Sequence, residues 1–310
     1  MFFGTVLKKQ LIKLLLCPVP VKEKRRFWRK KLELKWNCLN VEPYVGYFNS
    51  VWHKYDGLLK TTDQIETLIL GDSHAQFGIL PFIISGGGGG YNFSFNANSL
   101  YETYESLKFA VPKCKNLKNV ILVCSFYNGG YSLIRGSEAW HCRILAKKFN
   151  MPYDFGLNPK YDFAFYDKII EQMTPRFDRV YCQGYDFAGI EIHPSTKKTR
   201  ERALHHFKIY QKYKNQLPVL DEICAFCQKA DLRLILVDAP VRSDYAAVLA
   251  EAAPDTDLTA LIKEVAGRYQ IKLIKPAGFA DEDFADSDHL NFNGALKLTR
   301  QLVKVLENGK

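Results

Sequence analysis

The sequence has no run of about 20 apolar residues, the length that an α-helix needs to cross a bilayer. The features of a cleavable signal peptide are also missing from its start. Lys13 interrupts the apolar stretch there, and no small-residue cleavage site follows it. Cys17 follows Leu16, where a lipidation signal needs a small residue. We therefore expect a cytoplasmic protein with no membrane-spanning helix.

A disulfide framework is missing as well. The eight cysteines show no paired spacing, and Cys124 lies inside an apolar, strand-like segment. Cys224 and Cys227 form one CxxC pair with no second pair and no histidine at zinc spacing. This pattern predicts reduced, mostly buried thiols, and it indicates no metal site and no cofactor.

Net positive charge is concentrated at the N-terminus. The net charge is +10, and residues 1–36 hold eleven Lys or Arg against two Glu, so the rest of the chain is close to neutral. A neutral body argues against a nucleic-acid-binding groove. The arm, residues 1–40, combines a short amphipathic helix with a basic, aromatic cluster. Such a segment suits peripheral contact of residues 1–36 with an anionic membrane at its inner face, and the alternative is an ordinary solvated tail.

The remainder, residues 41–310, predicts one large α/β domain. Hydrophobic residues make up 47% of the sequence, which is enough for an extensive core. Short apolar strands alternate with amphipathic helices, a pattern typical of a doubly wound, flavodoxin-like parallel sheet with five strands and helices on both faces. We expect strands at 65–70, 91–95, 119–124, 232–237 and 271–274, and helices near 98–110, 198–214, 217–230, 257–269 and 291–307.

Two segments do not fit this alternation. Residues 86–90 are five consecutive glycines without the Gly-Lys-Ser/Thr ending of a phosphate loop, so they predict a mobile loop. Residues 150–195 are rich in Pro, Gly, Tyr, Phe and Asp, and they predict an insertion that contributes substrate contacts.

Polar residues follow every predicted strand, at positions 71–73, 96–98, 125–128, 238–240 and 281–289. The carboxyl ends of parallel strands share one edge, where ligands bind in such folds. The sequence therefore predicts a functional site rich in Ser, Asn, Asp and His at this edge.

Ser73 is the predicted nucleophile of that site. A serine hydroxyl needs a base within hydrogen-bond reach, and the base needs a carboxylate that orients it. Asp286 lies three residues before His289 in Asp-Ser-Asp-His. This spacing lets Asp286 hold one ring nitrogen of His289 while the other nitrogen faces Ser73.

These residues resemble the SGNH/GDSL hydrolase superfamily. Its first block appears as Leu70-Gly71-Asp72-Ser73, and its last block appears as Asp286-Ser287-Asp288-His289-Leu290-Asn291. The resemblance covers about 65–305, without 150–195. It implies the SGNH hydrolase fold, no cofactor, and the catalytic triad Ser73, His289 and Asp286.

The resemblance also implies an oxyanion hole formed by the backbone N–H groups of Ser73 and Ala97 and by the amide of Asn128. Ala97 stands where the superfamily has glycine. In the third block, Phe126 replaces a glycine and Gly129 replaces an aspartate. The Gly-Asp-Ser-His form is more similar to the glycan-acylating and glycan-deacylating branches than to lipases. The implied activity is an esterase or O-acyltransferase acting on an acylated bacterial surface glycan, its precursor or a small ester.

Four further residues are candidate substrate contacts, namely His74, Asn98, Asp238 and Arg242. For His74 the simpler interpretation is a solvated residue at a helix start, and for Arg242 it is a pair with Asp244. Three other histidines, His193, His205 and His206, are expected at the surface, and Asp72 is expected to bond loop amides.

A second function remains open at this point. The changes at Ala97 and Phe126 are compatible with a catalytically inactive, membrane-associated scaffold or binding protein in glycan assembly that keeps the fold.

Overall fold

The computed structural model describes residues 8–9, 11, 28–33, 41–87, 89–177, 180–187, 196–212, 216–254 and 256–308. Most of the predicted N-terminal arm lies outside these residues, and so does His193. None of the described helices is both long enough and apolar enough to span a membrane.

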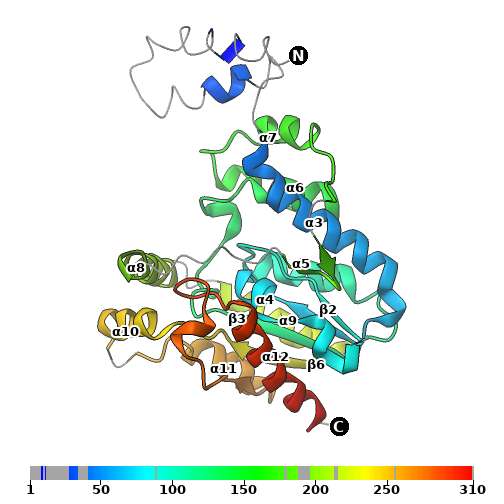
Figure 1. Ribbon diagram of the computed structural model, residues 1–310, viewed down its shortest axis with the longest axis vertical. Coiled ribbons are helices and arrows are strands. Elements are labelled where there is room, and N and C mark those ends of the chain that lie inside the picture. Colours follow the sequence, from blue (N-terminus) through cyan, green and yellow to red (C-terminus); the bar gives the residue numbers. More distant parts are fainter. Residues whose placement is uncertain are drawn as a thin grey trace.

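A five-stranded parallel sheet forms the centre of the molecule (Figure 1), as predicted. Its strands are β1 (Thr67–Leu70), β2 (Gly90–Asn92), β3 (Asn119–Cys124), β6 (Arg233–Asp238) and β7 (Leu273–Ile274), in the order β2-β1-β3-β6-β7. This corresponds to the doubly wound order 2-1-3-4-5. The order in which strands are added to the sheet reverses at β1, since β2 lies on one side of it and β3 on the other. The loops after β1 and β3 therefore diverge and leave room for a site.

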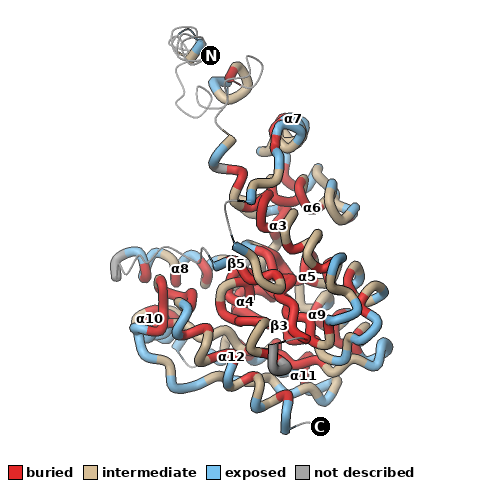
Figure 2. The backbone as a smooth tube through the Cα atoms, turned by 45° about the vertical axis from the view of Figure 1, so that its right-hand side comes forward, coloured by how far each residue is buried: buried red, intermediate tan, exposed pale blue. Residues whose placement is uncertain are grey.

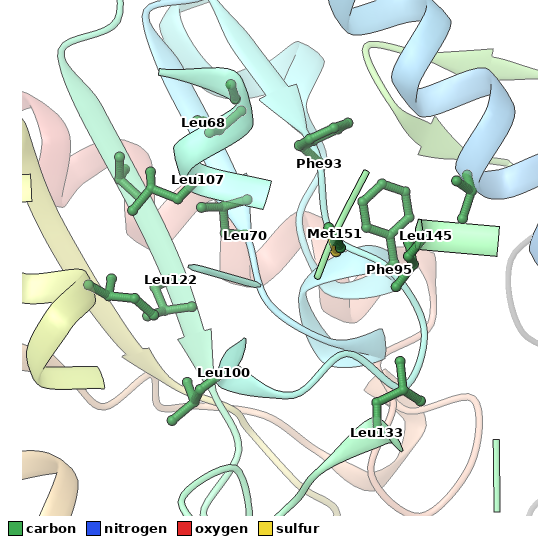
Figure 3. Packing of buried hydrophobic residues seen from close by; sticks show 14 of the residues in the cluster. Leu68, Leu70, Phe93, Phe95, Leu100, Leu107, Leu122, Leu133, Leu145 and Met151 are labelled. Atoms are coloured by element: carbon green, nitrogen blue, oxygen red, sulfur yellow. The ribbon is translucent and has the colours of Figure 1, made fainter. Parts of the chain in front are cut away.

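Helices cover both faces because alternate strand residues point in opposite directions. Leu68 and Leu70 pack into the larger core, whereas Ile69 between them packs into a smaller core on the opposite face. Figure 3 shows part of the larger core, where Phe93 and Phe95 lie near Leu145 and Met151.

The helices of the larger-core side include α3 (Glu42–Thr61), α5 (Leu100–Ala110), α6 (His141–Phe149), α7 (Phe163–Ile170), α9 (Leu217–Lys229) and α11 (Ala260–Arg268). The opposite face is covered by α4 (Ser73–Gly78) and α12 (Phe292–Glu307). In Figure 1, α3, α6 and α7 extend beyond one end of the sheet.

Two helices form a third cluster at the side of the sheet. Ala203 of α8 (Thr196–Lys212) packs with Tyr245 of α10 (Ser243–Ala252), and both belong to a cluster that includes Phe126 and Tyr127 after β3. In Figure 2, buried and exposed residues alternate along α8, as expected for a helix packed on one face. This packing brings α8 to the carboxyl edge of the sheet.

One sequence prediction needs correction. Gly86 and Gly87 end a 3₁₀ helix (Pro81–Gly87), Gly89 lies in a bend and Gly90 begins β2, so most of the described glycines of the 86–90 run belong to regular elements. An added Cβ at Gly90 would lie 2.3 Å from the Pro81 carbonyl oxygen, which explains a glycine there. The predicted insertion contains the 3₁₀ helix Phe155–Leu157, helix α7 and a hairpin of β4 (Tyr181–Cys182) and β5 (Tyr185–Asp186).

Candidate active site

Ser73 lies at the turn between β1 and α4. Gly71 makes this turn with φ of 142°, and an added Cβ would lie 2.9 Å from the Val123 carbonyl oxygen. Asp72 then caps α4, because its Oδ1 accepts the backbone N–H of His74 at 2.9 Å. The glycine and the cap together place Ser73 at the first position of the helix.

The three predicted triad residues lie in contact. Ser73 Oγ is 2.7 Å from His289 Nε2, and His289 Nδ1 is 2.9 Å from Asp286 Oδ2. Asp286 also accepts the backbone N–H of Asp288 (3.0 Å) and of His289 (2.8 Å). Burial raises the pKa of Asp286, but its bonds and the charge of His289 outweigh burial, so this pKa lies below its ordinary value. Asp286 is therefore ionised at neutral pH, and it favours the proton on Nδ1 of His289, which leaves Nε2 to accept from Ser73.

Ala97 adopts the backbone geometry that favours glycine. Its φ is 62°, in the left-handed region, and the residue lines the same cavity as Ser73. Within the described part of the chain, the backbone N–H groups of Ser73 and Ala97 have no hydrogen-bond acceptor. Both groups are therefore available as donors.

Asn128 is engaged elsewhere. Its Nδ2 donates to Asp72 Oδ2 at 3.1 Å, and its Oδ1 accepts the Ser125 backbone N–H at 2.6 Å. The hydroxyl of Ser125 donates to the same Asp72 oxygen at 2.9 Å. Asn128 is not among the residues that line the cavity beside Ser73. It thus belongs to a buried hydrogen-bond network around Asp72.

His74 is buried, so the interpretation as a solvated residue is wrong. Its Nδ1 lies 3.0 Å from Asp72 Oδ1, and its Nε2 lies 3.4 Å from Asp288 Oδ2. Burial lowers the pKa of His74, but Asp72 and Asp288 outweigh burial and raise it to about 10. The imidazolium stacks on the ring of His289, with centroids 4.8 Å apart and planes at 23°. His74 therefore links the loop that carries Ser73 to the loop that carries His289.

Asp288 is a site residue that was not predicted from the sequence. Its side chain is fully buried, and its Oδ1 lies 2.5 Å from Arg202 Nε of α8. Burial raises the pKa of Asp288, yet the bond with His74 and the charges of His289, His74 and Arg202 hold it well below the usual range. Arg202 is distant from Asp288 in the sequence, so this contact could not be predicted from sequence spacing. The only local signal for Asp288 is its place in the Asp-x-Asp-His motif.

His206 and His205 differ in burial although they are neighbours. His206 is buried, contrary to expectation, and its Nδ1 lies 2.6 Å from the Tyr245 hydroxyl. Burial lowers the pKa of His206 to about 3. His205 is exposed, as expected, and it lines the cavity.

A cavity of about 490 Å³ opens beside Ser73. Its wall combines polar and aromatic side chains from the sheet edge, the 127–138 segment and α8. The lining residues are Asp72, Ser73, Phe77, Asn96, Ala97, Asn98, Tyr127, Tyr131, Ser137, Glu138, Arg202, His205, His206, Ile209 and His289. No described residue of the predicted 150–195 insertion lines this cavity, so the predicted substrate contacts from that segment are not found.

Of the four candidate substrate contacts, only Asn98 lines the cavity. His74 is occupied by its two carboxylates. Arg242 pairs with Asp244 (2.7 Å) and donates to Thr199 Oγ1 at 2.8 Å. Asp238 ends β6 outside the cavity wall, where burial raises its pKa to about 6.

Among the described residues, one group could offer three ligand atoms to a metal ion, namely His74, Asp288 and His289. The nitrogens of His74 already face two carboxylates, and those of His289 face Asp286 and Ser73. Arg202 adds a positive charge at Asp288. The donor set therefore fits a hydrogen-bond network better than a metal centre.

Compared with known proteins, the chain matches no protein-family model and no curated sequence.

Proposed function

We propose that the protein is a serine-dependent ester hydrolase or O-acyltransferase related to the SGNH/GDSL superfamily. The observation that carries this proposal is the chain of contacts from Ser73 Oγ through the His289 ring to Asp286, at 2.7 and 2.9 Å. These distances lie within the range that activates a serine hydroxyl. The sheet order, the strand-turn-helix position of Ser73 and the left-handed Ala97 add support.

The proposed reaction follows the roles of the triad. Ser73 Oγ attacks the ester carbonyl carbon while His289 Nε2 takes the hydroxyl proton. The N–H groups of Ser73 and Ala97 stabilise the oxyanion, and each such donor typically contributes about 2.7–4 kcal/mol. His289 then protonates the departing alkoxide, which leaves an acyl group on Ser73. Water releases the acyl group in a hydrolase, and a sugar hydroxyl accepts it in a transferase.

We propose an acylated surface glycan or its precursor as the substrate. The cavity is polar and contains tyrosines, which suits a hydroxylated compound better than a lipid chain. The Gly-Asp-Ser-His form points in the same direction.

Labelling by a fluorophosphonate probe tests the nucleophile. We expect covalent labelling of the wild type and none of Ser73→Ala, with Ser243→Ala as the matched control that keeps labelling. Ser243 is exposed and outside the cavity wall. Equal labelling of wild type and Ser73→Ala would refute the proposed nucleophile.

The alternative is an inactive scaffold with the same fold. It is favoured by Asn128, whose amide serves Asp72 and not the cavity. A folded wild type that shows no Ser73-dependent labelling would support the scaffold.

We further propose that residues 1–36 bring the protein to the inner face of an anionic membrane. Their charge and aromatic residues support this, since each Lys or Arg near such a surface contributes about 1 kcal/mol. Deletion of residues 1–36 should abolish binding to anionic liposomes and spare small-ester hydrolysis. Unchanged liposome binding would refute the role of the arm.

A further inference from the structure

Three polar side chains in the cavity wall have hydrogen-bonding groups that no other described residue uses. Asn98 is 2% exposed, and its Oδ1 has no hydrogen-bond partner among the described residues. Within the described part of the chain, the carboxylate of Glu138 has neither a hydrogen bond nor an ion pair. Arg202 contacts Asp288 through Nε, and its terminal nitrogens have no partner in the ranges that the structure describes.

These groups supply both acceptors and donors. Asn98 Oδ1 and the Glu138 carboxylate accept, whereas the Arg202 guanidinium donates. A hydroxyl group donates one hydrogen bond and accepts others, so a compound with several hydroxyls satisfies this set. The apolar parts of Phe77 and Tyr131 line the same cavity and offer contact to the C–H groups of a ring.

The charges favour a neutral ligand. Asp288 offsets the charge of Arg202 at 2.5 Å, so little positive charge remains for an anion. Glu138 would repel an anionic ligand when it is ionised. Burial raises the pKa of Glu138, and the charge of Arg202 counteracts this only in part.

We propose that Asn98, Glu138 and Arg202 form a subsite that binds the hydroxyl groups of an uncharged, O-acylated sugar beside Ser73. This inference rests on the proposed ester chemistry, and it specifies the substrate class. Glu138 accepts hydrogen bonds from hydroxyls of the sugar ring, and Arg202 donates hydrogen bonds to oxygens of the ring. Asn98 accepts a hydrogen bond from a sugar hydroxyl close to Ala97.

The kinetic test compares an ester with and without sugar hydroxyls. The substrates are 4-nitrophenyl acetate and a panel of mono-O-acetylated hexoses. For Glu138→Gln we expect KM for the best acetylated hexose to rise at least tenfold, with kcat/KM for 4-nitrophenyl acetate within twofold of wild type. Glu222→Gln, at an exposed glutamate of α9 outside the cavity, is the matched control and should change neither value. Equal effects on both substrates, or no effect on the hexose, would overturn the subsite.

A binding test separates this inference from the proposed reaction. Ligand-observed NMR with the same hexoses uses Ser73→Ala, which cannot turn over. We expect binding by Ser73→Ala and at least tenfold weaker binding by Ser73→Ala combined with Glu138→Gln or with Asn98→Ala. Binding that these second changes leave intact, or no hexose binding at all, refutes the subsite while Ser73-dependent cleavage of 4-nitrophenyl acetate still upholds the esterase. Specific binding without any turnover by wild type supports the subsite and refutes the esterase.

Discussion

The charge of His74 is predicted to stabilise the contact between the Ser73 loop and the His289 loop. The ring lies between Asp72 and Asp288, and the side chains of all three are at most 4% exposed. His74→Gln removes the positive charge and leaves two carboxylates buried without it. Removal of one partner of a buried ion pair typically costs about 3–5 kcal/mol.

The pKa of His74 gives a similar magnitude. It rises from 6.5 to about 10 on folding, and each pKa unit corresponds to about 1.36 kcal/mol, which gives roughly 5 kcal/mol as an upper value. Because the folded pKa lies above the unfolded one, this stabilisation is fully present below pH 6.5. It is lost as the pH rises through about 10.

Urea unfolding of wild type and His74→Gln at several pH values measures this contribution. We expect the free energies of unfolding to differ by about 3–5 kcal/mol at about pH 6.5. At about pH 9.5 this difference should be smaller by at least about 2 kcal/mol. Lys54 titrates in the same window with the opposite sign, but its contribution cancels in the difference between the two proteins. His205→Gln, at an exposed position of α8, should change stability by less than about 0.5 kcal/mol. A difference below about 1 kcal/mol, or one that stays constant over this range, would refute the charged clamp.

Three further changes test the site and its support. Asp286→Asn should lower kcat for a small ester by about 10⁴-fold, the loss seen when the triad carboxylate of a serine protease becomes an amide; a loss below about tenfold would contradict its orienting role. Ala97→Gly should raise the free energy of unfolding by about 0.5–1 kcal/mol, because the left-handed conformation costs a non-glycine residue about 1–2 kcal/mol. A lower free energy of unfolding for Ala97→Gly than for wild type, measured by urea titration, would contradict this. Lys54 donates to the Ser94 carbonyl (2.7 Å), and burial lowers its pKa to about 7. Its folded pKa lies below the unfolded one, so Lys54→Met should remove a gain of stability between pH 7 and 10.5, and an unchanged pH profile would count against it.

The sheet was predictable because its central strands β1, β3 and β6 are largely apolar segments buried on both faces. The prediction of residues 119–124 matches β3, whereas the predicted strand at 271–274 shortens to Leu273–Ile274 at the sheet edge. Helix α3 was not predicted. It packs against α6, and this packing, which fixes its place, depends on residues that are distant in the sequence, such as Tyr47 and His141.

The contacts among Ser73, His289 and Asp286 were predictable for a local reason. Ser73 lies three residues after the last residue of β1, and Asp286 and His289 lie within one short loop, so sequence spacing constrains them strongly. The surroundings of His74 were not predictable in this way. A histidine at a helix start is exposed unless another segment covers it, and the covering groups come from Asp288 and from α8, which are far away in the chain.

Packing of α8 gives a physical explanation for the departures from the superfamily pattern after β3. Phe126, where the superfamily has glycine, packs into the cluster that seats α8, together with Ala203 and Tyr245. At Gly130 an added Cβ would lie 2.7 Å from the Ile209 carbonyl oxygen, so the chain after β3 approaches the α8 backbone closely. Docking of α8 at this place brings Arg202 to Asp288 and to the cavity wall. The segment that weakens the resemblance therefore holds the helix that supplies Arg202 to the proposed sugar subsite, so its changes do not favour the inactive scaffold over the proposed enzyme.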